Sequence, residues 1–266
     1  DLFEEYGIDP PDGQTTWEDW VEIASALTDG DNYGFSAIAT IDAALSWIAS
    51  AGGKYFDTEA EQYDLTDPGT EQGLQFFADL VNEYEVMKPI DDPGNDNYAR
   101  EQFYTGTIGM INDGPWQSTN IRANVDFRVG MGPLPIGPEG RKTPIAGSGF
   151  AMSAETDYPE ESYLAIKSIT SSESLSKLAE WGRGFPARES AVESFYVGQE
   201  EITGLNWIED SLPYSFPQLG PQNYQEFQNV FNQEIEALLL GQTNDAAAVL
   251  RRITERASSF TDVAEF

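Results

Sequence analysis

Short apolar stretches alternate with amphipathic helices along the whole chain, and this alternation limits the possible folds more than any other feature of the sequence. Apolar residues at helical spacing indicate the helices, and short apolar runs between turn residues indicate the strands. The predicted strands are residues 33–39, 107–112, 127–131 and 147–153. The predicted helices are residues 42–51 and 97–104, a segment that carries Leu74 to Tyr84, and segments that begin near Thr15, Pro159, Ser172 and Tyr224. This order of elements predicts an α/β fold.

Helix ends can also be placed from the sequence. Thr15 followed by Glu18 is the pattern of a capping box, and it predicts Thr15 as an N-cap residue. Asp157 is the expected cap of the helix that begins near Pro159. Residues 203–222 contain three prolines and two glycines, so we expect a connector there.

The charge excludes several classes of partner. The chain has 46 acidic and 14 basic residues, which gives a net charge of −32. A phosphate backbone needs a basic surface, so nucleic acid is not an expected partner, and anionic membranes are disfavoured for the same reason. The acidic residues are spread along the chain, as in proteins of salt-loving organisms, where salt screens their mutual repulsion.

The chain contains neither cysteine nor histidine. Disulfides, thiolate nucleophiles, zinc sites of the usual kind and histidine-based catalysis are therefore excluded. Pairs of carboxylates are inevitable at this acidity and do not indicate a glycosidase. We therefore expect no enzymatic activity, no cofactor and no dedicated metal site. The chain begins at Asp1 without a signal-like segment, and we expect an N-terminal part of the full-length protein to precede it.

The six tryptophans have different expected roles, and that of Trp207, which lies in the connector, is ambiguous. Trp17, Trp20, Trp47 and Trp181 lie on predicted helices or at a helix end, and core packing is expected for each. Trp116 differs, because "GMINDGPW" (residues 109–116) is an apolar strand followed by a Gly-Pro bend. Ligands of open α/β sheets bind at strand ends, where an aromatic ring can stack on a sugar. This geometry alone favours ligand stacking and packing at the sheet edge equally.

Several motifs resemble one family. "FYTGTIGMINDGPW" follows the pattern Phe-x-x-Gly-x-x-Gly-Met-x-x-x-Gly-x-Trp, and it is accompanied, in family order, by "PPDGQTTWEDW", "WIASAGGKYFD", "VGMGPLPIGPEG", "AGSGFAMSAET" and "GFPARES". Together these resemble the extracellular solute-binding proteins of ABC importers, of the maltodextrin-binding type. Each motif is weak, but their number and order cover essentially the whole chain.

The resemblance implies a periplasmic-binding-protein-like fold of type II, with two α/β lobes that close around a ligand. Most of lobe one would lie in the N-terminal part that this chain lacks. Residues 1–145 would form the first part of lobe two, 146–206 the returning segment of lobe one, and 207–266 the hinge and C-terminal helices of lobe two. Chain crossings are expected near Ala146-Gly147 and within residues 207–216.

The resemblance also implies ligand-binding residues. The tryptophan of the family's Gly-Pro-Trp turn stacks on a sugar, which assigns that role to Trp116. By the same argument, the family's hinge strand assigns contacts to Gly147, Ser148 and Gly149, and the loop after the first lobe-two strand assigns one to Asp42. The start of the last long helix assigns a contact to Tyr224 or Asn223, and lobe one assigns a contact to Arg188. Ala43 and Ala44 stand where aromatic residues are common, which favours a small sugar over a long maltodextrin.

The expected function is therefore capture of a mono- or oligosaccharide outside the cell and its delivery to the permease subunits of an ABC importer. We expect a monomer that is anchored to the membrane through its N-terminal segment. One alternative keeps the family but changes the ligand to a glycerol phosphoester, a polyamine or another small solute. An anionic ligand would need Arg183 or Arg188. A carbohydrate-active enzyme is the second alternative.

Overall fold

A computed structural model describes residues 1–57, 59, 62–90, 92, 95, 97–218 and 223–260 of the chain. Residues 219–222 of the predicted connector and 261–266 of the last predicted segment lie outside the described residues. The mixture of helices and strands confirms the α/β prediction. No helix within the described ranges is both long enough and apolar enough to cross a membrane.

The chain divides into two compact units. Unit 1 contains residues 1–112, 132–145 and 210–266, and unit 2 contains residues 113–131 and 146–209. The division after residues 145 and 209 falls close to the two expected crossings. Residues 113–131 belong to unit 2, although the sequence interpretation grouped them with residues 1–145. Whether these units correspond to parts of two lobes remains a prediction.

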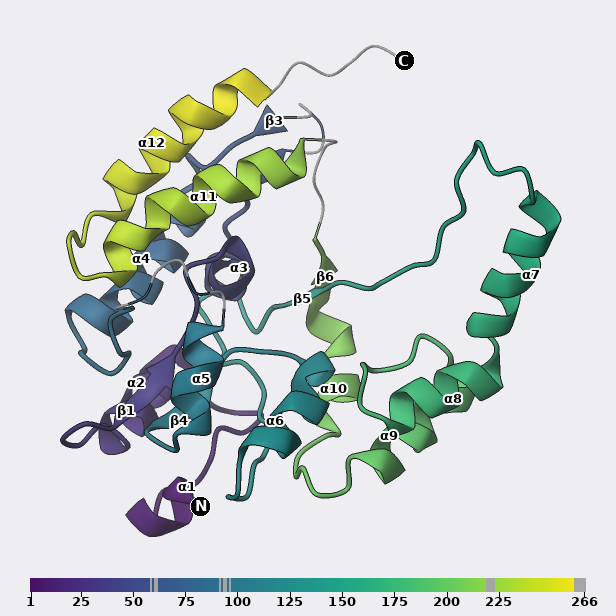
Figure 1. The fold of residues 1–266 in the computed structure, drawn as a ribbon. Coiled ribbons are helices and arrows are strands. Elements are labelled where there is room, and N and C mark those ends of the chain that lie inside the picture. Colours follow the sequence, from purple (N-terminus) through teal and green to yellow (C-terminus); the bar gives the residue numbers. More distant parts are fainter. Residues whose placement is uncertain are drawn as a thin grey trace. The chain divides into compact units, whose positions relative to one another are not determined.

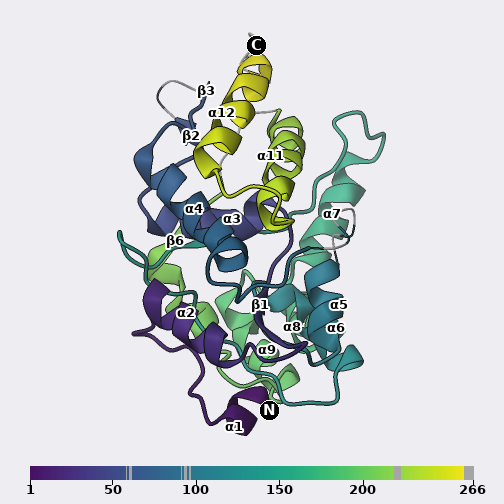
Figure 2. The same ribbon diagram turned by 90° about the vertical axis from the view of Figure 1, so that its left-hand side faces the viewer.

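Unit 1 holds most of the regular structure (Figures 1 and 2). Its helices are α1 (Leu2–Tyr6), α2 (Trp17–Ala26), α3 (Ile41–Ser50), α4 (Pro68–Asn82), α5 (Tyr98–Tyr104), α11 (Tyr224–Leu239) and α12 (Ala246–Ala257). Its strands are β1 (Tyr33–Ser36), β2 (Phe56–Asp57), β3 (Gln62–Tyr63), β4 (Ile108–Ile111), β5 (Thr143–Ile145) and β6 (Ser215–Pro217). The helix α10 (Trp207–Asp210) lies at the division between the units.

The strands pair two by two. β1 and β4 are parallel, with Phe35 opposite Met110, and β5 and β6 are parallel, with Pro144 opposite Phe216. β2 and β3 form an antiparallel pair. Parallel pairing of strands that are far apart in sequence agrees with the predicted alternation of strands and helices.

A continuous core fills unit 1. Trp17, Trp20 and Trp47 are all buried, which confirms their predicted packing, and Met110 of β4 belongs to the same cluster. Trp47 lies at the centre, with its ring centroid 6.0 Å from that of Trp20 and 6.2 Å from that of Phe35. Such tilted and edge-on ring pairs stabilise a core by about 0.5–1.5 kcal/mol each beyond the burial of their area.

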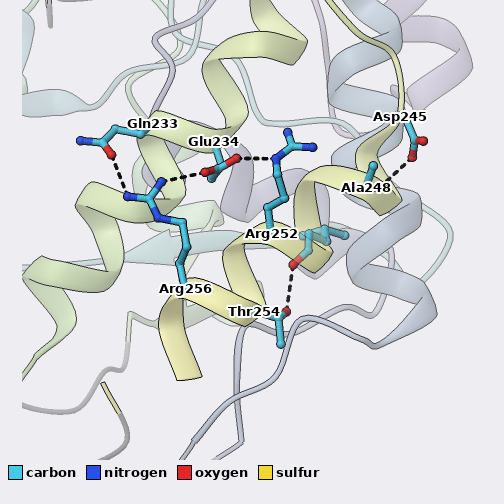
Figure 3. A network of polar contacts seen from close by, with 8 residues as sticks. Gln233, Glu234, Asp245, Ala248, Arg252, Thr254 and Arg256 are labelled. Atoms are coloured by element: carbon cyan, nitrogen blue, oxygen red, sulfur yellow. Dashed lines mark hydrogen bonds and ion pairs between the residues drawn. The ribbon is translucent and has the colours of Figure 1, made fainter. Parts of the chain in front are cut away.

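Helices α3 and α4 approach each other closely at Gly73. A Cβ atom at this position would lie 2.4 Å from Cα of Ile48, so only glycine permits the approach. Helices α11 and α12 also pack together, and an ion-pair network joins them (Figure 3). Glu234 of α11 accepts hydrogen bonds from Arg252 and Arg256 of α12, each at 2.7 Å.

Unit 2 is smaller and mostly helical. Its elements are the 3₁₀ turn η1 (Pro115–Gln117), α6 (Ser118–Asn124), α7 (Pro159–Ile169), α8 (Ser172–Glu180), the 3₁₀ turn η2 (Glu189–Ala191) and α9 (Val192–Gly198). Helices α8 and α9 pack around a cluster of four buried residues, Ala179, Phe195, Ile202 and Leu205. Helix α7 contributes no buried residue.

Two predicted strands are absent from unit 2, and one predicted core residue is exposed. Residues 127–131 form no strand, because only Gly130 pairs, in an isolated bridge with Thr203. Residues 147–153 have no strand partner among the described residues and are exposed. Trp181 caps the C-terminus of α8 and is 60% exposed, so its predicted core packing is wrong.

Two predicted helix caps are also wrong. Thr16 rather than Thr15 caps α2, and Asp19 rather than Glu18 completes the capping box. The reason is that the Thr15 hydroxyl accepts the Asp12 N–H at 2.8 Å in the preceding turn. Helix α7 begins at Pro159 without a side-chain cap from the expected residue, Asp157. Proline suits the first helical position because its φ is already fixed near the helical value, and because it has no backbone N–H that would need a partner there.

Candidate functional site

The carboxyl ends of β1 and β4 share an edge, since the two strands are parallel, and α3 follows β1 at this edge. The Thr40 side chain caps α3. The backbone N–H of Ile41 donates to Oδ1 of Asn232 on α11 at 2.8 Å. These contacts fix the first turn of α3, which carries Asp42. The partial positive charge of a helix N-terminus favours a carboxylate there.

Asp42 and Tyr224, two of the predicted site residues, are brought together by Gln218. The Gln218 Nε2 group donates one hydrogen bond to Oδ1 of Asp42 and another to the Tyr224 hydroxyl, the latter at 2.6 Å. Asp42, which lies 176 positions before Gln218, thus forms one polar cluster with Gln218 and Tyr224 within unit 1. A carboxylate, an amide and a phenol provide both donors and acceptors for the hydroxyl groups of a solute.

Tyr224 keeps its proton throughout the ordinary pH range. Burial raises the pKa of its hydroxyl well above the usual value, and the nearby Tyr55 and Asp42 act in the same direction. The hydrogen bond from Gln218 lowers the pKa but does not outweigh burial. The ring of Tyr55 lies 6.1 Å from that of Tyr224, measured between centroids. Tyr224 therefore acts as a neutral hydrogen-bonding group, not as a charge.

Asn223, the other residue predicted at the start of α11, does not join this cluster. Its Nδ2 group donates to the backbone carbonyl of Phe260, and its Oδ1 atom is buried without a partner among the described residues. The side chain of Asn223 is thus used to hold the segment after α12. Tyr224, rather than Asn223, contacts Asp42's partner Gln218.

In unit 2, Trp116 lies on a constrained turn. Gly114 is extended, with φ −135° and ψ 173°, and Pro115 begins η1. A Cβ atom on Gly114 would come within 2.2 Å of two ring atoms of Trp116, so the indole folds over the glycine backbone. The side chain is still 53% exposed. Trp116 is therefore a surface residue that its own turn holds in place.

The predicted glycine-rich segment at residues 147–149 is exposed within the described structure. A Cβ atom on Gly147 or Gly149 would meet nothing within 4 Å, so neither glycine is required there by a close neighbour. The close approach of a ligand that the resemblance implies for them remains a prediction.

Arg188 also lies in unit 2, directly before η2. Its Nε atom donates to the backbone carbonyl of Thr170 at 2.6 Å, and the side chain is exposed. This bond links the loop before η2 to the C-terminus of α7. Arg183, the other basic residue considered, is exposed as well. A guanidinium has five N–H donors, so Arg188 keeps donors for a further partner.

The predicted residues are divided between the two units, with Asp42, Asn223 and Tyr224 in unit 1 and Trp116, Gly147, Ser148, Gly149 and Arg188 in unit 2. Gln218 was missed, because residues 203–222 were interpreted only as a connector. The signal available was a polar residue that follows the short apolar strand β6. Across the described residues, no group of three or more metal-ligating acidic side chains is assembled.

Two curated relatives resemble the chain in sequence. The maltotriose-binding protein of Pyrococcus abyssi is 32% identical over 123 residues, which is 45% of this chain and 26% of the relative. The sn-glycerol-3-phosphate-binding periplasmic protein UgpB of Shigella dysenteriae is 24% identical over 152 residues, which is 54% of this chain and 34% of the relative. The chain thus spans about a quarter to a third of the length of these two relatives.

The fold resembles that of the GacH receptor of Streptomyces glaucescens, whose crystal structures include a complex with acarbose. The TM-score is 0.82 at 17% identity, over 99% of this chain and 68% of the receptor. At this identity the likeness shows the fold alone, which is the predicted type II periplasmic-binding-protein fold.

One family model matches the chain over residues 1–174, and its description is bacterial extracellular solute-binding protein. The match covers more than half of the chain and includes the "GPW" turn and the glycine-rich segment after residue 146. The chain therefore belongs to the family of bacterial extracellular solute-binding proteins.

Proposed function

We propose that the full-length protein is the carbohydrate-binding component of an ABC importer, which captures a mono- or oligosaccharide and delivers it to the permease without changing it chemically. Family membership supports the binding role. The maltotriose-binding relative and the acarbose-binding structural neighbour support a sugar as the ligand.

Trp116 is the observation that carries this proposal. A half-exposed indole, held by a Gly-Pro turn directly after β4, offers a flat apolar face to a sugar ring. Stacking on one aromatic ring contributes only about 0.5–1.5 kcal/mol beyond burial. Most of the affinity must therefore come from hydrogen bonds.

Asp42, Gln218 and Tyr224 supply a set of such hydrogen-bonding groups in the proposal. Asp42 accepts from sugar hydroxyls, and Tyr224 acts as a neutral donor or acceptor. The backbone of residues 147–149, Arg188 and Asn223 complete the proposed set, as the family resemblance implies.

The proposal also covers the division into lobes, the oligomeric state and the location of the protein. In this proposal, residues 1–145 and 207–266 belong to lobe two, and residues 146–206 return to lobe one. The compact units differ in one range, because residues 113–131 lie in unit 2 and not in unit 1. The protein acts as a monomer outside the cell, anchored through an N-terminal segment. Its net charge of −32 suits a salty medium, where screening weakens self-repulsion.

A glycerol phosphoester is the second candidate ligand, because the UgpB relative is described as binding sn-glycerol-3-phosphate. A phosphate needs cationic or N–H donors. The exposed Arg183 and Arg188 provide guanidinium groups in unit 2 for this alternative.

The proposal is tested with Trp116→Ala in the full-length protein. We expect the affinity for the cognate sugar, measured by calorimetry in high salt, to fall about tenfold, which corresponds to about 1.4 kcal/mol. Trp181→Ala is the matched control, because Trp181 is also in unit 2 and is 60% exposed. A screen of sugars, glycerol phosphates and polyamines by thermal shift identifies the ligand beforehand.

Equal affinity for the wild type and Trp116→Ala, together with a lower melting temperature, would show that Trp116 is only a packing residue. Conversion of the bound sugar into a product would contradict the non-enzymatic role. Thermal stabilisation by glycerol phosphates but not by sugars would favour the second candidate ligand.

A further inference from the structure

A groove of about 750 Å³ lies on unit 1, away from the Asp42 cluster, with α2 and α4 as its main walls. Its apolar part is aromatic: Trp17 of α2 stacks on Phe76 of α4 with ring centroids 4.1 Å apart, and Val21 and Tyr84 lie beside them. Tyr84 is 40% exposed. The groove therefore presents an apolar floor to solvent.

Carboxylates line the groove from both helices. Glu18 and Glu22 are one helical turn apart on α2 and are exposed, while Glu71 and Asp79 come from α4. No lysine or arginine is among the lining residues, and within the described ranges none of these four carboxylates forms an ion pair. Burial, and then the charges of Glu83, Asp79 and Glu18, raise the pKa of Tyr84. The floor thus lies in an uncompensated negative field.

Trp17 fixes the apolar floor in place. Its side chain lines the groove but is only 5% exposed, so most of the ring is held by the packing around it. A second hollow of about 370 Å³ shares Thr66 and Glu71 with the groove, and Arg251 and Glu255 are among its other lining residues. Two adjoining hollows offer more room than a small molecule needs, which favours a chain segment as the occupant.

We propose that this groove docks an amphipathic helix of a partner protein, with its apolar stripe on Trp17, Val21 and Phe76 and its lysine or arginine residues beside Glu18, Glu22 and Glu71. Helices bind grooves of this kind through apolar residues at positions i, i+3, i+4 and i+7. The acidic rim selects basic flanks by charge complementarity and excludes acidic ones. The site is separate from the proposed sugar site, and it does not depend on the identity of the sugar.

The test uses the full-length protein and a labelled 18-residue helical peptide of leucine and lysine, with leucine at i, i+3, i+4 and i+7. A second peptide of the same composition has its leucines dispersed around the helix. Fluorescence anisotropy at physiological salt measures both dissociation constants. Glu18→Gln/Glu22→Gln removes two groove charges, and Glu160→Gln/Glu161→Gln removes two charges in the first turn of α7 as the matched control.

We expect the striped peptide to bind more tightly than the dispersed one. We also expect Glu18→Gln/Glu22→Gln to weaken its binding at least about fivefold, as two partly screened ion pairs allow, while the control double variant changes it less than about twofold. All three proteins should keep the same melting temperature, because the four glutamates are exposed.

Three results would overturn the proposal. Equal binding of both peptides, or equal weakening by both double variants, would mean attraction by net charge alone. Groove-dependent binding of spermidine without binding of the striped peptide would mean a small cation as the occupant. Self-association in sedimentation that Glu18→Gln/Glu22→Gln abolishes would mean a second copy of this chain.

Discussion

Unit 1 and unit 2 bury their apolar side chains to very different extents. Unit 1 has a continuous core with three tryptophans, to which α2, α3, α4, α11 and α12 all contribute. The core cluster of unit 2 has four buried residues, and α7 contributes none of them. Large side chains of this helix, such as Tyr163 and Leu164, are 58% and 60% exposed.

The difference shows where this chain keeps its stability and where it exposes apolar surface. Apolar burial is the main favourable term in folding, at about 25 cal/mol per Å². Unit 1 buries a large set of apolar side chains in one cluster, whereas the described part of unit 2 leaves large apolar side chains in solvent. Substitutions in the two cores should therefore have different consequences.

The largest effect is expected for Trp47→Ala in unit 1. Trp47 is 1% exposed and lies among the rings of Trp17, Trp20 and Phe35. Removal of a buried tryptophan costs about 3–5 kcal/mol of unfolding free energy. Urea unfolding followed by circular dichroism measures the loss. Trp47→Phe is the control, and it should cost less, because it keeps most of the ring volume and removes an N–H that has no partner among the described residues.

A smaller effect is expected for Leu205→Ala in unit 2. Leu205 is 6% exposed, but its cluster is small and half-buried residues such as Phe185 border it, so the site can relax around the cavity. We expect a loss of about 2 kcal/mol, at the low end of the range for such substitutions. Hydrogen exchange should show faster opening of α8 and α9 and unchanged protection of α3 and α4. Equal deprotection of both units would mean that they unfold as one.

The same contrast explains how much of the fold could be predicted from the sequence. In unit 1, the sequence pattern predicted β1, α3, α5, β4 and α11 nearly at their observed positions, because each element contributes apolar residues to the common core. In unit 2, the apolar residues at 147–153 suggested a strand, but a strand needs a neighbour to accept its hydrogen bonds. Trp181 was assigned to a core because it is apolar and lies at a helix end, although the structure leaves this helix end exposed.

The candidate site was predictable only in part. Asp42 and Tyr224 follow from family motifs, but their link through Gln218 joins positions 176 residues apart, and no local pattern reveals such a pair. The exposure of Trp116 depends on the local Gly-Pro turn, so the sequence could indicate it. The use of Asn223 to hold the segment after α12 depends on tertiary packing and could not be foreseen.

The helix N-caps of α2 in unit 1 and α8 in unit 2 allow a further comparison, in which removal of a cap is expected to lower the stability less than the core substitutions do. Thr16 accepts the Asp19 N–H, and the Asp19 carboxylate accepts the Thr16 N–H in return, whereas Ser171 accepts one N–H, that of Ser174. We expect Thr16→Ala to cost about 1 kcal/mol and Ser171→Ala about 0.5 kcal/mol. Thermal unfolding of both variants measures the difference. A larger loss for Ser171→Ala would contradict the view that unit 1 carries most of the stability.

The smallest effect is expected for the ion pairs. Burial acts to raise the pKa of Glu234, but the hydrogen bonds and charges of Arg252 and Arg256 together lower it below its ordinary value of 4.5. Because the pKa is lower in the folded state, the stabilisation is present above the unfolded value and is lost as the pH falls through the folded value. Glu234→Gln should therefore reduce stability at pH 7 by less than about 1 kcal/mol, and the variant and the wild type should converge well below pH 4.5. Glu173→Gln in unit 2 removes a more exposed ion pair with Lys177. It should not change the stability measurably at pH 7 or in acid. Thermal unfolding across this pH range checks both variants, and a loss that persists in acid would mean that Glu234 acts through packing instead of charge.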